Sequence, residues 1–349
     1  NLTGINLNEI DLVGKDLTGT ILIGADLSGK DLTGTILKGA DLTNANLSGV
    51  DLSGKDLTGT ILKGADLSGT VLTSSILSHA DLSYLDLTGT KLVGVILEHA
   101  NLFSANLSGI DISQSLLKDT NLSNADLSHI NLSYSVLDRV SLTNADIRYA
   151  NFTGSNLHSV DFTVIKDKNW DGVIIRETVL DHSKLESMDF TGKDLTISTF
   201  KYTKLKDANF SNDVILHGTL FVMADLEDAN FEGADLAPKH FRGKLFKNAA
   251  HLDLSSNEFA IELCMVGSGQ SLSIYCNPFT MMMTQAEVRG NDLYVTYFLY
   301  CNFYQANLEN TNFANSNLYT TNFEDANLSN SILIEADLSG ASLLNVDLT

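Results

Sequence analysis

Few side chains in this sequence have the types and spacing that catalysis or metal binding requires. His79 and His99 stand 20 residues apart, and stacking would bring them close enough to share a metal ion, but no third ligand accompanies them. Cys264, Cys276 and Cys301 are odd in number and lack metal-ligand or disulfide spacing, which indicates buried structural thiols in a reducing compartment. No nucleophile, phosphate-binding or metal motif occurs. The sequence therefore predicts a non-enzymatic protein without catalytic residues, metal or cofactor.

Acidic residues recur at regular positions and are the first candidate for a binding function. The chain has 43 acidic and 22 basic residues, for a net charge of −21, so duplex DNA and anionic membranes should repel it. Regularly spaced carboxylates could instead imitate a phosphate backbone. The predicted acidic face consists of Asp11, Asp31 and Asp51 in one row and Asp26, Asp66 and Asp86 in the neighbouring row. The alternative is that short Asp and Asn side chains bond to nearby backbone at the corners of the fold.

Apolar residues at another set of regular positions are the second candidate. They occupy one outward-facing row at intervals of 20 or 40 residues: Ile36, Ile76, Ile96, Leu116 and Val136. A continuous exposed apolar strip predicts a contact surface for a protein partner or for self-association. The alternative is that β-branched residues merely favour pairing between strands, or that another part of the chain covers them.

A five-residue repeat must position all of these side chains. Leu, or occasionally Ile or Phe, recurs at every fifth residue from Leu2 to Phe162 in 33 successive units. This period fits neither a helix nor a simple strand, and it predicts a flat-sided coil in which each unit forms one side. The residue two before each Leu has a 20-residue super-period, since Ala25, Ala45 and Ala65 form one row and other rows prefer Ser or β-branched residues. We therefore expect four units per turn and a square cross-section.

The repeat resembles that of the pentapeptide-repeat proteins. Their A(D/N)LXX unit is matched by Ala25-Asp26-Leu27, Ala45-Asn46-Leu47, Ala65-Asp66-Leu67 and Ala125-Asp126-Leu127. The resemblance covers roughly residues 1–252 and 301–349, and it implies an all-β fold, a right-handed quadrilateral β-helix solenoid. Some members of this family are understood to act as duplex mimics that engage DNA gyrase, and another class occurs among large secreted effectors of enteric pathogens.

Departures from the repeat divide the chain into four predicted parts. Residues 1–162 form a regular β-helix, and residues 163–252 an irregular continuation, in which the register fails from Thr163 to Leu180 and resumes three residues out of phase at Leu185. Residues 253–300 form a non-repeat insertion, for which we expect an antiparallel meander of four strands. The repeat returns in residues 301–349. The stretch from Lys166 to Lys247 holds 12 of the 22 basic residues, which indicates either a docking site for an acidic partner or a solvated face.

The predicted function is that of a β-helical scaffold or binding module that presents flat faces to a protein partner. The alternative is an acidic DNA mimic that binds gyrase or another topoisomerase. The sequence shows no apolar run long enough to span a membrane and no signal peptide. The repeat is already in register at Asn1 and lacks a cap at either end, and one explanation is that flanking segments of a larger bacterial effector are missing. The expected location is cytoplasmic, or that of a secreted bacterial effector if an N-terminal signal precedes Asn1.

Overall fold

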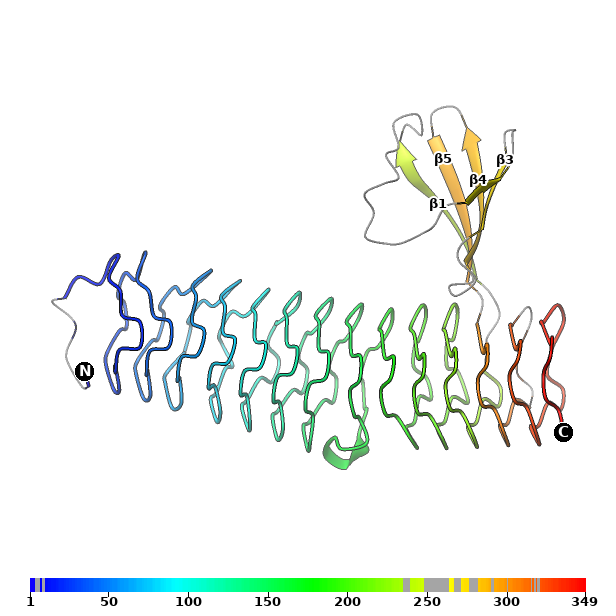
Figure 1. Ribbon diagram of the computed structural model, residues 1–349, viewed down its shortest axis with the longest axis horizontal. Helices are drawn as coiled ribbons and strands as arrows, with labels where there is room; N and C mark the ends of the chain where they lie inside the picture. The colour runs from blue at the N-terminus through cyan, green and yellow to red at the C-terminus, as the bar shows by residue number, and fades with distance from the viewer. Residues whose placement is uncertain are drawn as a thin grey trace. The chain divides into compact units, whose positions relative to one another are not determined.

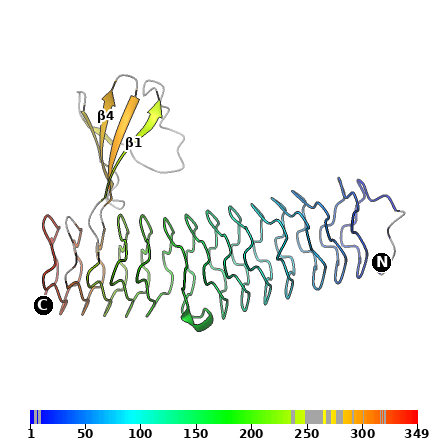
Figure 2. The ribbon, with the colours of Figure 1, turned by 180° about the vertical axis from the view of Figure 1, so that it is seen from behind.

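The computed structural model shows two compact units, residues 1–185 (unit 1) and residues 186–349 (unit 2), each built around a β-helix (Figures 1 and 2). It describes residues 1–3, 7, 10–234, 239–247, 264–266, 271–275, 282–289, 292–299, 301–314, 316, 318 and 321–349. Within these ranges, no helix is long and apolar enough to cross a bilayer.

Parallel pairing between successive coils builds the β-helix. The residue before each inward-pointing Leu forms an isolated parallel bridge with the residue 20 positions later, as in Asp26 to Asn46 and Asn46 to Asp66. Four five-residue units therefore complete one coil, which confirms the square, right-handed β-helix expected from the repeat. We number the faces of each coil 1 to 4 in chain order, so that Leu12, Leu17, Leu22 and Leu27 point inward from faces 1, 2, 3 and 4.

Small residues fill the interior corners next to the buried leucines. The residue two before each Leu is commonly Ala, Ser or Thr, and it is buried at most positions. Its hydroxyl donates at many positions to a backbone carbonyl, either of the coil before it, as from Thr35 Oγ1 to Leu12 O at 2.7 Å, or three residues earlier, as from Thr60 Oγ1 to Leu57 O at 2.8 Å. Most of these buried hydroxyls thus keep a hydrogen bond, whereas Thr321 Oγ1 has none.

The first register break lies between Phe162 and Trp170, which are eight residues apart instead of five. Trp170 is buried and its ring packs on Phe162 with centroids 5.0 Å apart, so Trp170 occupies the next inward position. The three extra residues form the 3-10 turn η1 (Lys166–Lys168). The prediction that the register resumes at Leu185 is therefore wrong: it resumes at Trp170 and continues through Ile175 and Leu180, because an indole fills the position that elsewhere takes Leu.

Unit 2 has an interior of alternating phenylalanine and leucine. Among the described residues from Phe190 to Phe323, Phe alternates with Leu at the inward positions, so two of the four faces contribute continuous columns of stacked rings. Consecutive rings in each column have centroids 4.6 to 5.1 Å apart. The columns consist of Phe190, Phe210, Phe231 and Phe313, and of Phe200, Phe221, Phe303 and Phe323.

An antiparallel sheet interrupts the β-helix of unit 2. Its strands are β1 (Lys239–Lys247), β2 (Cys264–Val266), β3 (Ser271–Tyr275), β4 (Met282–Arg289) and β5 (Asp292–Leu299), in the order β1-β5-β4-β3-β2. The prediction of a four-stranded insertion in residues 253–300 is incomplete, because β1 lies before residue 253 and adds a fifth strand. The chain leaves and returns to the β-helix at adjacent points, so its first and last strands run antiparallel and pair, from Lys239 with Leu299 to Lys247 with Asp292.

The pairing between successive coils continues across the inserted sheet. Leu220 pairs with Asn302 and Asp225 with Asn307, across an interval of 82 residues instead of 20 or 21. Thr311 Oγ1 likewise donates to Leu226 O at 3.0 Å. The sheet is therefore an insertion in the chain that leaves the pairing between coils intact.

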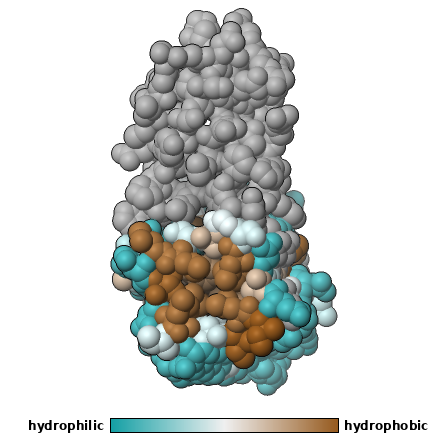
Figure 3. Space-filling view, turned by 90° about the vertical axis from the view of Figure 1, so that its right-hand side faces the viewer, coloured by the Kyte–Doolittle hydropathy of each residue, from teal (hydrophilic) through white to brown (hydrophobic). Residues whose placement is uncertain are grey.

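The last coil of unit 2 exposes its apolar residues. The inward residues Leu343 and Leu348 are 43% and 61% exposed, whereas their equivalents one coil earlier, Phe323 and Leu328, are buried. Figure 3 shows an apolar surface at this end of unit 2. Inward residues are buried only between two coils, so each coil depends on its neighbours for its core.

Candidate functional site

Face 2 of unit 1 carries an uninterrupted row of apolar side chains. Parallel bridges join Ile76 to Ile96, Ile96 to Leu116 and Leu116 to Val136, and we call these four residues the apolar ladder. Leu116 is exposed and the other three are half-buried. At a coil spacing of ~4.8 Å, the ladder is about 14 Å long.

Ile36 lies in the same row but apart from the apolar ladder. It is 47% exposed. Asp56 stands between Ile36 and Ile76 and binds Lys38 Nζ at 3.1 Å. The structure thus brings together four of the five residues that the sequence analysis assigned to this surface.

Charged residues line one edge of the apolar ladder. The residue after each inward Leu on face 2 forms a column of Glu98, Lys118, Asp138 and His158, which backbone hydrogen bonds between coils hold in line. The next residue of each unit forms the adjacent corner column of His79, His99, Asp119 and Arg139. We call these two columns the charged edge.

Arg139 organises the charged edge. Its guanidinium donates to both carboxylate oxygens of Asp119, from Nε and from Nη2, each at 2.9 Å, and its Nη1 donates to Asp138 Oδ2 at 2.9 Å. This hydrogen bonding lowers the pKa of Asp119 and raises the pKa of Arg139. His99 Nδ1 lies 3.8 Å from Asp119 Oδ2, and the ring of His99 stacks on His79 with centroids 4.9 Å apart. The edge therefore presents fixed charges of both signs.

The opposite edge of the apolar ladder carries no charge. Its corner column consists of Ser74, Gly94, Gln114, Tyr134 and Gly154. Tyr134 is 61% exposed, and its ring lies against Gly154 of the next coil. Sequence reasoning singled out neither edge. Reading every twentieth residue one and two positions after the inward Leu would have found both.

The predicted acidic face has a different local chemistry from the one expected. Asp11, Asp31 and Asp51 lie on face 1, and each accepts a hydrogen bond at Oδ1 from the backbone N–H two residues later, at 2.8 to 3.0 Å. Asp26, Asp66 and Asp86, on face 4, do the same at 3.0 to 3.1 Å. Hydrogen bonds from the hydroxyl and the backbone N–H of the following Ser or Thr lower the pKa values of Asp26, Asp31, Asp51 and Asp66. These carboxylates serve as turn caps.

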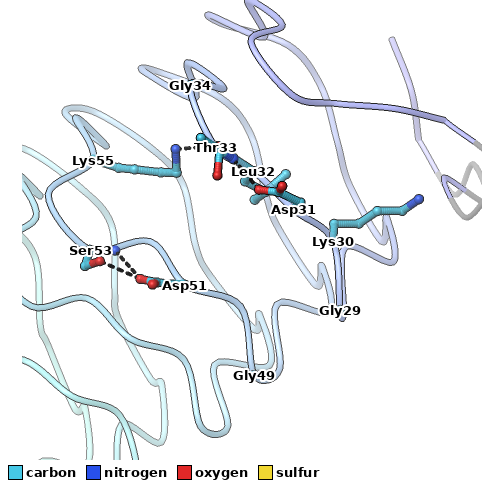
Figure 4. A pocket seen from close by; sticks show the side chains of 10 residues that line it. All are labelled: Gly29, Lys30, Asp31, Leu32, Thr33, Gly34, Gly49, Asp51, Ser53 and Lys55. Carbon is cyan, nitrogen blue, oxygen red and sulfur yellow. Dashed lines mark hydrogen bonds between the residues drawn. The ribbon is translucent and has the colours of Figure 1, made fainter.

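Neutral and basic side chains also interrupt the acidic rows. On face 4, Asn46 lies between Asp26 and Asp66, and on face 1 Val71 follows Asp51. Asp31 and Asp51 line a hollow of about 570 Å³ together with Lys30 and Lys55 (Figure 4). Lys55 Nζ donates to Leu32 O at 2.5 Å, and its charge helps to lower the pKa values of both aspartates. The rows therefore do not form the continuous line of free carboxylates that phosphate mimicry would need.

Groups that could perform chemistry are not assembled in the part of the chain that the structure describes. No three His, Cys, Asp or Glu side chains among these residues are placed to hold a metal ion. Cys301 is fully buried, and burial raises the pKa of its thiol. Such a thiol remains protonated and is a poor nucleophile.

Comparisons with known proteins relate the chain to other repeat proteins. Eight copies of a family model described as pentapeptide repeats match residues 1–39, 22–54, 31–64, 56–83, 80–119, 120–158, 301–340 and 321–349. Together these matches cover more than half of the chain. No curated protein matches it.

Several solved structures are similar to this one. One is HetL, a pentapeptide repeat protein involved in heterocyst differentiation regulation from the cyanobacterium Nostoc sp. strain PCC 7120, with 21% identity over 93% of this chain and 91% of HetL, at a TM-score of 0.22. Another is QnrB1, a plasmid-mediated fluoroquinolone resistance protein, with 17% identity over 64% of this chain and 85% of QnrB1, also at 0.22. A thylakoid-lumen protein from Arabidopsis thaliana is 31% identical over 35% of this chain and 68% of its own, at 0.16.

Proposed function

Because this chain belongs to the pentapeptide-repeat family, we propose that it is a non-enzymatic β-helical scaffold that binds a protein partner through face 2 of unit 1. The observation that carries this proposal is the apolar ladder beside the charged edge. Protein interfaces combine an apolar centre with a polar, charged rim. Isolated exposed apolar residues are common on monomers, but four in a continuous row are not.

The repeat itself makes the apolar ladder unusual. At the same position most other units have Asp or Asn, which caps the following turn. Ile96 and Leu116 give up that hydrogen bond and expose apolar surface to water. Folding does not require this exchange, since neighbouring coils fold with Asp56 or Asn156 at the equivalent place. A binding role accounts for it.

The geometry supports a duplex mimic less well. Imitation of a phosphate backbone needs regularly spaced, solvent-facing negative charges, whereas the predicted acidic residues cap local turns and alternate with Asn, Val and Lys. A mimic should inhibit or protect DNA gyrase. We expect the purified protein to leave gyrase supercoiling unchanged at micromolar concentration, and inhibition abolished by replacing Asp31 and Asp51 with Asn would favour the mimic instead.

A photo-crosslinking side chain placed at Leu116 tests the proposed function directly. In cells that produce the protein, we expect a covalent adduct with a protein from position 116. The added double substitution Ile76→Asp/Ile96→Asp should remove that adduct. Asp is the usual residue at this position of the repeat, so these substitutions preserve the fold.

The matched control lies on face 3. Ile21 and Ile61 occupy the same position of the repeat and are each 40% exposed. Ile21→Asp/Ile61→Asp should leave the adduct from position 116 intact, and the crosslinker at position 61 should give none. Equal yields from positions 116 and 61 would overturn the proposal.

A further inference from the structure

We propose that the occupant of face 2 is a second copy of this chain, bound antiparallel with face 2 against face 2. This inference rests on the proposed function, since it identifies the partner of the same surface. Six coils contribute, with inward residues Leu77, Leu97, Leu117, Leu137, Leu157 and Leu180. The two-fold axis lies in the interface, perpendicular to the β-helix axis, and passes between the coils of Leu117 and Leu137.

The antiparallel arrangement places the apolar ladder of each copy on that of the other. Leu116 lies opposite Val136 of the second copy at the centre. The row continues beyond Val136 through Asn156 and Val179. Ile96 therefore lies opposite Asn156 of the second copy, and Ile76 opposite Val179. Leu116, the most exposed side chain of the apolar ladder, is thus buried at the centre of the contact.

Charge complementarity at the charged edge supports the antiparallel arrangement. A two-fold axis in this direction keeps the charged edges of both copies on the same side and reverses their order. Lys118 then lies opposite Asp138 of the second copy, and Glu98 opposite His158. In the corner column, Asp119 lies opposite Arg139 of the second copy. Symmetry forms each contact twice, so every charge of this edge between Glu98 and His158 faces one of opposite sign or a histidine.

The two adjacent registers lack that property. Moving the axis onto the coil of Leu117 would place Lys118 opposite Lys118 and Asp119 opposite Asp119. Moving it onto the coil of Leu137 would place Asp138 opposite Asp138 and Arg139 opposite Arg139. Juxtaposed like charges are strongly unfavourable at an interface.

The parallel arrangement fails for a different reason. Beside the apolar ladder, a two-fold axis along the β-helix would place the charged edge of each copy against the uncharged corner column of the other, Ser74 to Gly154. Glu98 and Lys118 would then lose water without meeting a charge of opposite sign on the second copy, which costs free energy that the apolar contacts would have to offset. The observed distribution of charge therefore selects the antiparallel dimer centred between Leu117 and Leu137.

The small area of the proposed interface predicts weak dimerisation. Six coils at ~4.8 Å span about 24 Å, and a side of three extended residues is ~10 Å wide. This is smaller than the ~800 Å² per partner of standard interfaces, so we expect reversible association in the micromolar range or weaker. The net charge of −21 opposes association at low salt, and ~0.15 M salt screens it beyond about 8 Å.

Substitutions that reverse the charges of Lys118 and Asp138 test the antiparallel dimer in the full chain. Sedimentation velocity over a concentration series at 0.15 M salt should show a monomer–dimer equilibrium. We expect Lys118→Glu and Asp138→Lys each to weaken dimerisation at least about tenfold, because each creates two like-charge contacts across the axis. The double variant Lys118→Glu/Asp138→Lys should dimerise again.

A mixture of the two single variants gives the sharpest result. Glu at position 118 of one chain then faces Lys at position 138 of the other, and Asp138 faces Lys118, so the mixture should form heterodimers that neither variant forms alone. This readout does not depend on the absolute stability of either variant, and circular dichroism confirms that both are folded. A monomeric parent chain, or a mixture that remains monomeric, would overturn the inference.

The crosslinking experiment separates this inference from the proposed function. An adduct from position 116 with the mass of two chains supports both. An adduct with a different protein, together with a monomeric parent chain, overturns the second copy as partner while the docking role of face 2 stands. Absence of any adduct overturns both.

Discussion

At the scale of single residues, the repeat is a set of local hydrogen-bonding rules. Asp or Asn before the inward Leu caps the turn two residues later, and the residue at the end of each unit takes the left-handed conformation, as in Gly154 with φ 66° and Asn44 with φ 56°. Because these conditions recur every five residues, a departure from them signals a second requirement. Gly154 and Asp146 obey these rules but each makes an additional contact, and each leads to a prediction.

Gly154 accommodates the ring of Tyr134. A Cβ built on Gly154 would lie 2.5 Å from Cε1 of Tyr134, whereas one built on Gly19, with a similar φ of 62°, meets no atom within 4 Å. We expect Gly154→Ala to lower the free energy of unfolding by about 0.5 to 1 kcal/mol more than Gly19→Ala, since both share the left-handed penalty of ~1 kcal/mol. Urea titrations would measure the difference. Adding Tyr134→Ala should remove it, and equal losses for both glycine variants would contradict the proposed contact.

Asp146 is the carboxylate with the strongest local pairing. It accepts a hydrogen bond from Arg148 Nε at 2.8 Å and lies 3.5 Å from Lys166 Nζ. The hydrogen bond from Arg148 lowers the pKa of Asp146 from 3.8 to about 2. A lowered pKa means that the folded state favours the charged form, so this stabilisation is complete above pH ~4 and is lost as the pH falls towards 2.

The pH dependence of unfolding tests this pairing. Asp146→Asn should destabilise the protein at pH 5 by about 1 to 2 kcal/mol, and it should flatten the decline in stability between pH 4 and pH 2. Arg148→Met should flatten the same interval, because it removes the main partner of the carboxylate. An unchanged slope in both variants would show that other groups dominate acid unfolding.

At the scale of elements, continuity of stacking decides what the β-helix can accommodate. Phe303 stacks on Phe221 with centroids 5.0 Å apart although the antiparallel sheet lies between them in the sequence. Asn302 N donates to Thr219 O at 3.1 Å on the same side of the coil. The coil on either side of the sheet therefore has its full set of neighbours. The three-residue turn η1 is a smaller example, because it leaves Trp170 at the next inward position.

Deletion of the sheet should therefore leave the β-helix folded. We expect a chain that lacks residues 239–299, with the flanks joined, to retain its β-helical circular dichroism spectrum and to unfold within a few degrees of the parent. Loss of the cooperative transition of unit 2 would contradict this expectation and would assign the sheet a structural role. Hydrogen exchange at Asn302 and Asn307 reports directly on the junction.

At the scale of the whole molecule, stability accumulates from neighbour to neighbour. A coil contacts only the coils before and after it, so a local defect weakens nearby coils most. The two columns of phenylalanine make unit 2 dependent on ring stacking, whereas leucines form most of the interior of unit 1. The net charge follows from the same repetition, because each side of a coil tends to contribute one turn-capping Asp or Asn.

Removal of one stacked ring should therefore have a local effect. We expect Phe221→Ala to destabilise unit 2 by about 3 to 5 kcal/mol, since a fully buried aromatic side chain is lost and a cavity remains. Hydrogen exchange should show lost protection in residues 195–234 and 301–328 and unchanged protection in residues 40–120. A uniform loss of protection along the chain would contradict nearest-neighbour stability.

The sequence by itself determined the coil. The five-residue period specifies which side chain points inward, and the 20-residue super-period specifies four sides, because stacked positions share one environment. It also identified the row that contains Ile76, Ile96 and Leu116. These features depend only on contacts between a residue and its equivalents one coil away, so a periodic pattern records them.

Only the tertiary structure decided how the chain folds where the repeat breaks and which contacts each row of side chains makes. Trp170 is an inward residue because the turn η1 takes up three extra residues before it, and β1 is a strand because it pairs with the distant β5; a five-residue period records neither. The acidic rows looked like a charged surface, but their carboxylates bind the backbone two residues later. The periodic sequence contains the columns of the charged edge, but only the structure shows that Arg139 binds both Asp119 and Asp138 there.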